Sequence, residues 1–309
     1  MTISPENQQE PRVPLSYKDM ESSSHFAVGP PKWLFHYTSL SSASQILYSK
    51  SLWLTKIQYL NDTSELKIAF DLFKNAVELR LKELITNETE KSKFLLLAKS
   101  QIDSFKQTNL CVASFCENGD LLSQWRAYGS GGLGVALGFS GKRLEELQNT
   151  GFTNIWKCIY RPEIQERVAN DLVKILEKSF DVCYQNKNPN NWEKTKEDLI
   201  GHFNTTFLKV APVLKDRHFE EEKEWRLVTT PMKNTNTNYH PIITDKRVSQ
   251  VYIVNFETSR TQKHDFIGTM TIGPTANPEQ IGDTFQIASS QLAYEPILFE
   301  KSKIPFRGS

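Results

Sequence analysis

Two carboxylates and an arginine alternate in the segment FEEEKEWRLV, residues 219–228. Successive side chains of an extended strand point to opposite faces, so we expect Glu222, Glu224 and Arg226 to share one face. Such a trio could stabilise a cationic transition state or orient a hydroxyl group. The alternative is a solvated charge run on an edge strand, where charged side chains discourage aggregation.

A histidine and a tyrosine stand together at the end of the apolar run KWLFHYTS, residues 32–39. The same alternation puts His36 and Thr38 on one face and Tyr37 on the other. The histidine is either part of a pocket that does chemistry or a structural group whose ring nitrogens are satisfied in place.

Ser114 lies in CVASFCE, a run that is typical of a buried strand. Because Ser114 and Cys116 share a face, the hydroxyl interrupts an apolar row, and a buried hydroxyl requires a partner. Cys111 or Cys116 could serve as a nucleophile with His36, but the strand context favours buried, inert thiols.

The helix-like stretch DLLSQWRAY carries Trp125, Arg126 and Tyr128. On a helix Trp125 and Tyr128, three residues apart, share a face. They are either an aromatic core anchor or the lining of a pocket in which Arg126 meets a phosphate.

The glycine cluster GSGGLG, residues 129–134, has spacing that suggests a dinucleotide-binding loop. That motif needs a strand before it and a helix after it, whereas here a helix-like piece precedes and a strand-like piece follows. The sequence therefore predicts a flexible turn that leads into a strand.

The bulk composition is that of an ordinary globular protein, with 309 residues, 39% hydrophobic, and 37 Lys+Arg against 36 Asp+Glu. Near-neutral charge gives no electrostatic case for general nucleic-acid or membrane-surface binding. Four cysteines without a CxxC pair, and the absence of a membrane span or signal-peptide core, favour a cytoplasmic protein. No metal-ligand spacing such as HExxH occurs, so we expect no metal.

The order of the expected elements indicates an α+β fold with a mixed or antiparallel β core. We expect a flexible tail over residues 1–30 and a single domain over 31–309, with helical insertions around 64–107 and 165–215. Ser39 or Ser41 is a candidate cap for the helix that follows the first strand, and Asp62 with Glu65 resembles a capping box.

Several sequence blocks resemble known families. A His-Tyr-Thr block, a later Ser-Phe and a still later Glu-x-Glu resemble the three-part motif of ADP-ribosyltransferases, which unite those strands around NAD. The blocks FHYTS, NDTSE, SFC, QWRAYGSGGLGVALGF, EKEWRLV, TIGP and SKIPFR resemble, in this order, a bacterial family of unknown function numbered 2971. The second resemblance runs from Trp33 to Arg307.

The ADP-ribosyltransferase resemblance implies a role for each matching residue. His36 would bind the ribose on the nicotinamide side, and Tyr37 or Tyr128 would stack on the nicotinamide. Ser114 would brace the catalytic Glu224. The remaining residues of this implied site are Glu222, which would orient the incoming nucleophile, and the NAD-binding residues Thr38, Phe115, Trp125 and Arg126. Two positions depart from the usual motif, the histidine in the first block and Phe-Cys after Ser114, and they leave the acceptor type open.

The functional hypothesis is an enzyme that cleaves NAD and transfers ADP-ribose to a protein or nucleic-acid acceptor. The resemblance suggests a toxin or phage-defence effector, with an antitoxin or a defence-system partner. Two alternatives stay open: a non-catalytic module that binds a nucleotide or protein, and a magnesium-dependent nuclease that uses Asp62 and Glu65.

Overall fold

A computed structural model describes residues 26–60, 65–84, 89–102, 105, 108–150, 152–230, 239–244, 247–256 and 264–305. Within these ranges one ten-stranded sheet is combined with helices, so the fold class is α+β, as predicted. The strands are β1 (Trp33–Thr38), β2 (Ser51–Lys56), β3 (Cys111–Cys116), β4 (Val135–Ser140), β5 (Thr153–Lys157), β6 (Glu224–Thr229), β7 (Tyr239–Thr244), β8 (Arg247–Asn255), β9 (Ile267–Ile272) and β10 (Leu298–Lys301).

The helices lie between the strands in the chain. The α-helices are α2 (Leu40–Ser49), α3 (Glu65–Glu83), α4 (Glu90–Gln101), α5 (Leu122–Ala127), α6 (Gly141–Glu146), α7 (Pro162–Gln185), α8 (Trp192–Val210) and α9 (Pro278–Gln291). Short 3₁₀ turns are η1 (Ile57–Tyr59), η3 (Ser130–Gly132), η4 (Leu147–Thr150), η5 (Ala211–Val213) and η6 (Arg217–Glu222).

The sheet branches at β3. One edge of β3 pairs along its length with β6, which pairs in turn with β5. The other edge meets β1 at Phe35↔Cys116 and β2 at Thr55↔Val112. From β1 the sheet continues through β4 and β9 to β10, and from β2 through β8 to β7. All pairs are antiparallel except β9 with β10, so the sheet is mixed.

The three strands that carry the His-Tyr, Ser-Phe and Glu-x-Glu blocks are therefore neighbours, in the order β1, β3, β6. Together with β4 they lie in one mixed sheet, as predicted.

The two faces of the central strands belong to different cores. Val112 and Val228 pack with helices α3, α4, α7 and α8 on what we call the arm face. Phe115 and Trp225 pack with α2 and with β2, β4 and β9 on what we call the α2 face. Because both faces are covered, all six residues of β6 are buried.

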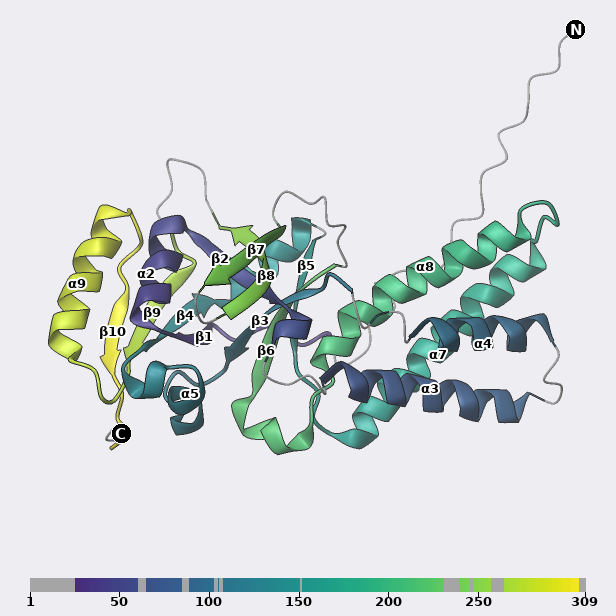
Figure 1. Cartoon of the computed structure of the whole chain (residues 1–309), viewed down its shortest axis with the longest axis horizontal. Coiled ribbons are helices and arrows are strands. Elements are labelled where there is room, and N and C mark those ends of the chain that lie inside the picture. Colours follow the sequence, from purple (N-terminus) through teal and green to yellow (C-terminus); the bar gives the residue numbers. More distant parts are fainter. Residues whose placement is uncertain are drawn as a thin grey trace, which may run out of the picture.

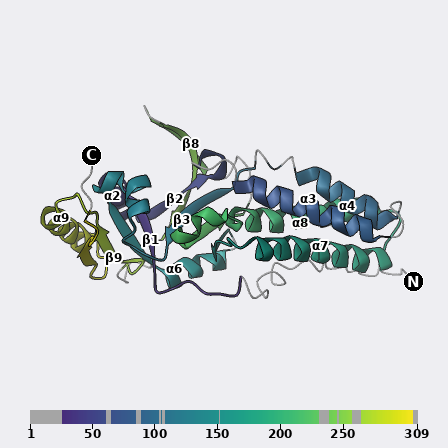
Figure 2. The ribbon, with the colours of Figure 1, turned by 90° about the horizontal axis from the view of Figure 1, so that it is seen from below.

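Helices α3, α4, α7 and α8 form an arm that extends from one side of the sheet (Figures 1 and 2). Its interior is aromatic: Phe73 packs against Phe203 and Phe207, with ring centroids 4.8 and 5.4 Å apart, and Phe94 against Phe180 at 4.9 Å. The arm is composed of the two helical segments that the sequence places between the strands.

Two local expectations are met near the C-terminal end of β1. Ser39 caps α2 by accepting a hydrogen bond from the Ser42 amide. The glycine cluster forms the turn η3 and leads directly into β4, as predicted. Gly134 leaves no room for a side chain, because a Cβ there would lie 2.2 Å from the Thr38 carbonyl oxygen.

Three sequence expectations either differ from the structure or concern residues outside the described ranges. Of the expected tail, residues 1–25 are outside the described ranges, and Phe26 is buried against Trp156. Asp62 also lies outside the described residues. Trp125 and Tyr128 do not share a buried face, since Trp125 is fully buried whereas Tyr128 follows the end of α5 and is exposed.

The packing of the arm gives a stability prediction. Phe73→Ala should lower the free energy of unfolding by about 3–5 kcal/mol, because it leaves a cavity beside the rings of Phe203 and Phe207. The control Leu79→Ala, on the same helix but 56% exposed, should change it by less than about 0.5 kcal/mol. Urea unfolding of both variants measures the difference, and equal effects would contradict the arm packing.

Candidate functional site

A buried ion-pair cluster lies where β6 begins, beside the last residue of β3. Glu224 is 3% exposed and contacts two cations. The Arg226 Nε lies 2.8 Å from Glu224 Oε1, its Nη2 lies 3.1 Å from Oε2, and the Lys215 Nζ lies 2.5 Å from Oε2. Both carboxylate oxygens are therefore engaged by positive charge.

Glu222 joins the same cluster through Lys215. The Lys215 Nζ lies 2.5 Å from Glu222 Oε2, so one ammonium group bridges the two glutamates. The side chains of Lys215 and Glu222 are 7% and 13% exposed, which makes Glu222 the more accessible carboxylate. We call Lys215, Glu222, Glu224 and Arg226 the four-charge cluster.

Two predictions about this stretch are wrong. Glu222 is not on a strand: it ends η6, and Lys223 adopts a left-handed conformation (φ 42°) that separates η6 from β6. The alternative of a solvated edge strand also fails, because β6 lies between β3 and β5 and is buried on both faces. The two carboxylates nevertheless meet, because Lys215 holds both.

The cluster keeps Glu224 ionised in spite of its burial. Burial alone raises the pKa of the Glu224 carboxyl, but the charges of Arg226 and Lys215 outweigh it and lower the pKa to about 2. For Lys215, burial and the charge of Arg226 lower the pKa, but the charge of Glu224 and the hydrogen bonds to Glu222 and Glu224 together outweigh them, so the pKa lies above its usual range. Both shifts favour the charged pair.

Neighbouring groups complete the hydrogen bonding. The Glu224 amide donates to the Tyr160 hydroxyl at 2.9 Å, and the Arg226 Nη1 donates to the Pro212 carbonyl at 2.5 Å. These contacts reduce the cost of burying four charges, since buried ions are tolerated only when paired and hydrogen-bonded.

His36 lies on the α2 face, opposite to the cluster. Its ring contacts Phe115 and Phe139, at centroid distances of 5.8 and 6.5 Å, and its Nδ1 lies 3.0 Å from the Ser114 carbonyl oxygen. Burial lowers the pKa of His36, against the effect of the Ser114 carbonyl. The imidazole thus bonds to β3 beside the point where β1 and β3 separate, and it does not approach Glu224.

Tyr37 and Trp125 hold the loop that follows β3. The Tyr37 hydroxyl donates to the Asn118 carbonyl and accepts from the Leu121 amide, both at 2.9 Å. The Trp125 indole Nε1 donates to Asp120 Oδ1 at 2.8 Å, and its ring meets that of Tyr37 edge-on. Both side chains are buried in structural contacts.

The other predicted residues lie at different places in the fold. In the strand register Ser114 pairs with Arg226, and Cys116 pairs with Glu224. Ser114 therefore shares the cluster's face but lies two residues along β3 from the level of Glu224. Phe115 is buried on the α2 face. Thr38 is buried at the end of β1, where its carbonyl oxygen lies close to Gly134.

Arg126 and Tyr128 lie on an exposed surface at the end of α5. The structure thus brings Glu222, Glu224 and Ser114 to one face of the sheet, where Tyr37 and Trp125 also pack against Cys116, and places His36 and Phe115 on the other face. Lys215 was missed because nothing in the run VAPVLK, beyond a lysine at the end of an apolar segment, marks it.

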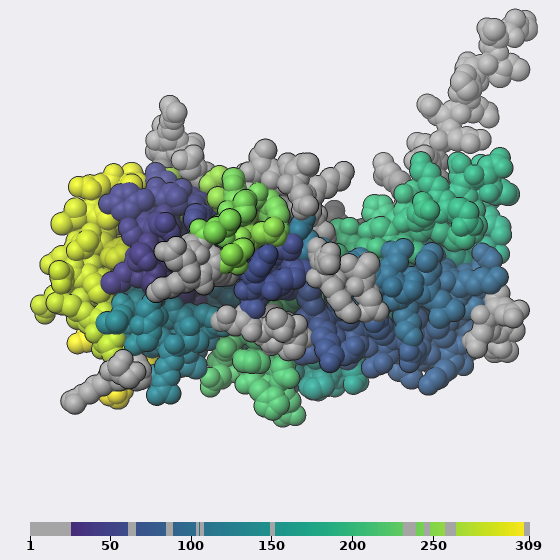
Figure 3. Space-filling view, viewed as in Figure 1, coloured from purple at the N-terminus to yellow at the C-terminus, as the bar shows by residue number. Residues whose placement is uncertain are grey.

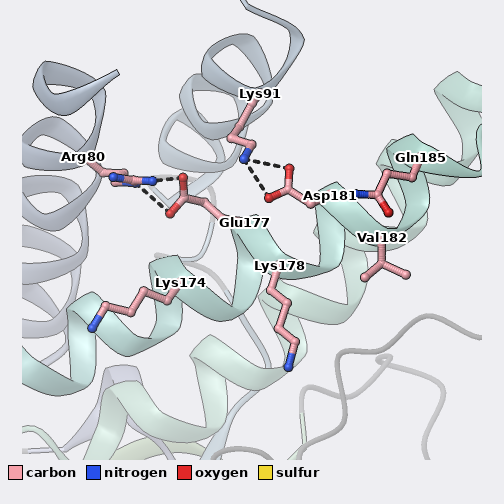
Figure 4. Close-up of a pocket in the computed structure, with 8 residues that line it drawn as sticks. All are labelled: Arg80, Lys91, Lys174, Glu177, Lys178, Asp181, Val182 and Gln185. Carbon is pink, nitrogen blue, oxygen red and sulfur yellow. Dashed lines mark hydrogen bonds and ion pairs between the residues drawn. The ribbon is translucent and has the colours of Figure 1, made fainter. Parts of the chain in front are cut away.

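Two pockets of the described chain lie away from this cluster. One, of about 300 Å³, is on the arm, where Arg80 pairs with Glu177 and Lys91 pairs with Asp181 (Figure 4). The other, of about 320 Å³, is lined by residues 26–30 and by α6, η4 and β5 residues. Neither is lined by a predicted site residue, and on the arm each carboxylate is neutralised by a cation of another helix.

Among the described residues, no group of three or more His, Cys, Asp or Glu side chains could hold a metal ion. None of the helices in the described ranges is both long and apolar enough to cross a membrane.

Comparison with known families identifies one match. Residues 124–227 match the model of a family described as a protein of unknown function (DUF2971). The matched segment runs from α5 to β6 and contains the glycine turn and the whole four-charge cluster. It agrees, over this segment, with the resemblance to family 2971. Neither curated proteins nor solved structures give a significant match.

The pKa of Glu224 gives a pH prediction. Its folded pKa of about 2 lies below the ordinary value of 4.5, so its stabilisation is complete above about pH 5 and is lost as the pH falls towards 2. At pH 7, Glu224→Gln should cost about 3–5 kcal/mol, because it breaks a buried ion-pair cluster. At pH 3 that cost should shrink by roughly 2 kcal/mol.

Urea unfolding at the two pH values measures this change. The control Glu300→Gln, an exposed carboxylate on β10, should have a small effect that does not depend on pH in this way. A cost for Glu224→Gln that is the same at pH 7 and pH 3 would contradict the ion-paired state of Glu224.

Proposed function

We propose that this chain is a cytoplasmic ADP-ribosyltransferase-like enzyme that uses NAD as a substrate and transfers ADP-ribose to a macromolecular acceptor. The observation that carries the proposal is the adjacency of β1, β3 and β6, the strands that contain the three motif blocks. At the start of the third strand the two glutamates of the Glu-x-Glu block meet through Lys215.

The chemistry requires a carboxylate near the ribose. The bond between ribose C1′ and the nicotinamide nitrogen breaks, its electron pair leaves with nicotinamide, and the sugar becomes an oxocarbenium-like cation. An acceptor hydroxyl or other nucleophile then bonds to C1′ and loses its proton. In this proposal Glu224 stabilises the cation and Glu222, the more exposed carboxylate, orients the acceptor.

The roles of the remaining residues rest on the resemblance. Tyr128 and Arg126 are exposed and accessible to a ligand, whereas Tyr37 and Trp125 serve the fold. The biological setting, a toxin or phage-defence effector with an antitoxin or a defence-system partner, also follows from the resemblance.

A second candidate function is a nucleotide- or protein-binding module without catalysis. A specific observation favours it: both oxygens of Glu224 contact cations, and two adjacent positive charges oppose the formation of a third. His36, on the opposite face, does not complete a cleft with Glu224. The nuclease hypothesis gains no such support, since Asp62 lies outside the described residues.

The first test of the proposal is the activity of Glu224→Gln. Release of nicotinamide and labelling of a cell lysate with tagged NAD should both fall about 10²-fold or more, because one electrostatic contact to the transition state is lost. Glu221→Gln, an exposed neighbour in the same acidic run, is the matched control and should retain activity.

Circular dichroism must show that Glu224→Gln is folded at the assay temperature. Labelling by wild type that persists at the same rate in Glu224→Gln would remove the catalytic role of this residue. Wild type that binds NAD but releases no nicotinamide would favour the second candidate.

Glu222→Gln separates orientation from cation stabilisation. Transfer to the acceptor should fall more than hydrolysis of NAD, because water needs less orientation than a bulky acceptor. Measuring both rates on the same variant gives the ratio. A fall of equal size in both rates would mean that Glu222 stabilises the cation and does not orient the acceptor.

A further inference from the structure

The Lys215 side chain links the end of the η5 segment to the start of β6. Along the chain, the two are joined by the short exposed turn of residues 216–223. Asp216 to Lys223 lie between Lys215 and Glu224, and six of these residues form η6. No η6 residue is buried, and Figure 3 shows the segment in green at the lower edge of the molecule. This exposed turn borders the four-charge cluster through Glu222 and Phe219, which both contact Lys215.

The turn is held to the rest of the molecule through Lys215. In the described part of the chain, the hydrogen bonds and ion pairs of residues 216–222 are to one another or to Lys215. The Lys215 ammonium also lies 4.9 Å from the ring centre of Phe219, which is on η6. If the ammonium leaves the carboxylates, the turn loses its contact with β6.

The charges of the cluster are balanced. Two cations, Lys215 and Arg226, face two anions, Glu222 and Glu224. Removal of the ammonium alone leaves a net negative site with a buried carboxylate, which is costly. A ligand that carries one positive charge restores the balance, whereas a neutral ligand of the same shape does not.

We propose that Lys215 is an internal ammonium that occupies the ligand position of the Glu222–Glu224 pair and is exchanged for the cationic pyridinium of an oxidised nicotinamide ligand. The inference rests on the proposed function and names the charge that selects the ligand. Oxidised NAD carries this charge on its nicotinamide ring and reduced NAD does not. The exchange thus makes the site specific for the oxidised form.

Phe219 supplies a second part of the ligand's environment. The residue is 38% exposed, and the face of its ring already accepts the Lys215 ammonium, as an aromatic ring accepts a cation. In the proposed exchange the pyridinium takes the place of the ammonium over the Phe219 ring, beside the carboxylates.

The test uses a probe pair that differs in charge and that the enzyme cannot cleave at a ribose: 1-methylnicotinamide, a cation, and nicotinamide, which is neutral. Calorimetry with Lys215→Met should give a dissociation constant for 1-methylnicotinamide at least about tenfold lower than wild type, because the competing ammonium is gone. Nicotinamide should bind no tighter. The control Lys174→Met, whose side chain is 74% exposed on α7, should match wild type.

A second measurement needs no substitution. Wild type is acetylated with an amine-reactive reagent, and the modified lysines are read by mass spectrometry, with Lys174 as the internal reference. Labelling of Lys215 should rise in the presence of 1-methylnicotinamide and stay low with nicotinamide. Unchanged labelling of Lys215, or tighter binding of both probes by Lys215→Met, would overturn the inference.

The outcomes separate this inference from the proposed function. Selective binding of 1-methylnicotinamide by Lys215→Met, together with no release of nicotinamide from NAD by wild type, would keep the exchange and reject the enzyme. Glu224-dependent cleavage of NAD without any charge selectivity would keep the enzyme and reject the exchange.

Discussion

Burial of a glutamate, a lysine and an arginine beside the central strand, with a second glutamate partly buried next to them, is the constraint on which this structure depends. An interior strand that is covered on both faces normally carries apolar side chains, and β6 instead carries Glu224 and Arg226. Each charge is tolerated only because the others are present, so loss of one leaves an uncompensated ion in the core. The fold must therefore bring Lys215, from the end of the arm, to the start of β6.

The arm provides this convergence. Helices α7 and α8 return the chain to the sheet, and η5 and Lys215 then lie beside β6, where Pro212 accepts a hydrogen bond from Arg226. The branching of the sheet at β3 places the motif strands side by side, and His36 bonds to β3 next to the branch. The same architecture separates His36 from Glu224 by the thickness of the sheet. A ligand that contacts both His36 and Glu224 would have to reach from one face of the sheet to the other around the ends of the strands.

Sequence periodicity predicts much of this fold, because strand and helix patterns are local. Alternating apolar residues locate β3, β4 and β6, Ser39 marks the start of α2, and the order of elements gives the α+β class. Local patterns cannot show which faces of a strand are covered, so the sequence of Glu222–Glu224 fits either an open site or a solvated edge strand. The arm covers one face of β6 and excludes the solvated edge. That covering depends on contacts between residues that are distant in sequence.

The site is harder to predict for the same reason. The pairing of Lys215 with Glu222 and Glu224 depends on the path of η5 and η6 and on the left-handed Lys223, none of which has a sequence signature. Trp125 and Tyr37 combine aromatic character with polar groups, as pocket residues do, but their polar atoms bind the loop after β3.

The central claim is that Lys215 and Glu224 form one buried unit that a ligand must open. A double-mutant cycle with Lys215→Met, Glu224→Gln and the combined variant, measured by urea unfolding at pH 7, tests it most directly. The account predicts a coupling free energy of about 2 kcal/mol or more, with the combined variant less destabilised than the sum of the single ones. Additivity within about 0.5 kcal/mol would mean that the two side chains do not depend on each other, and would contradict the account.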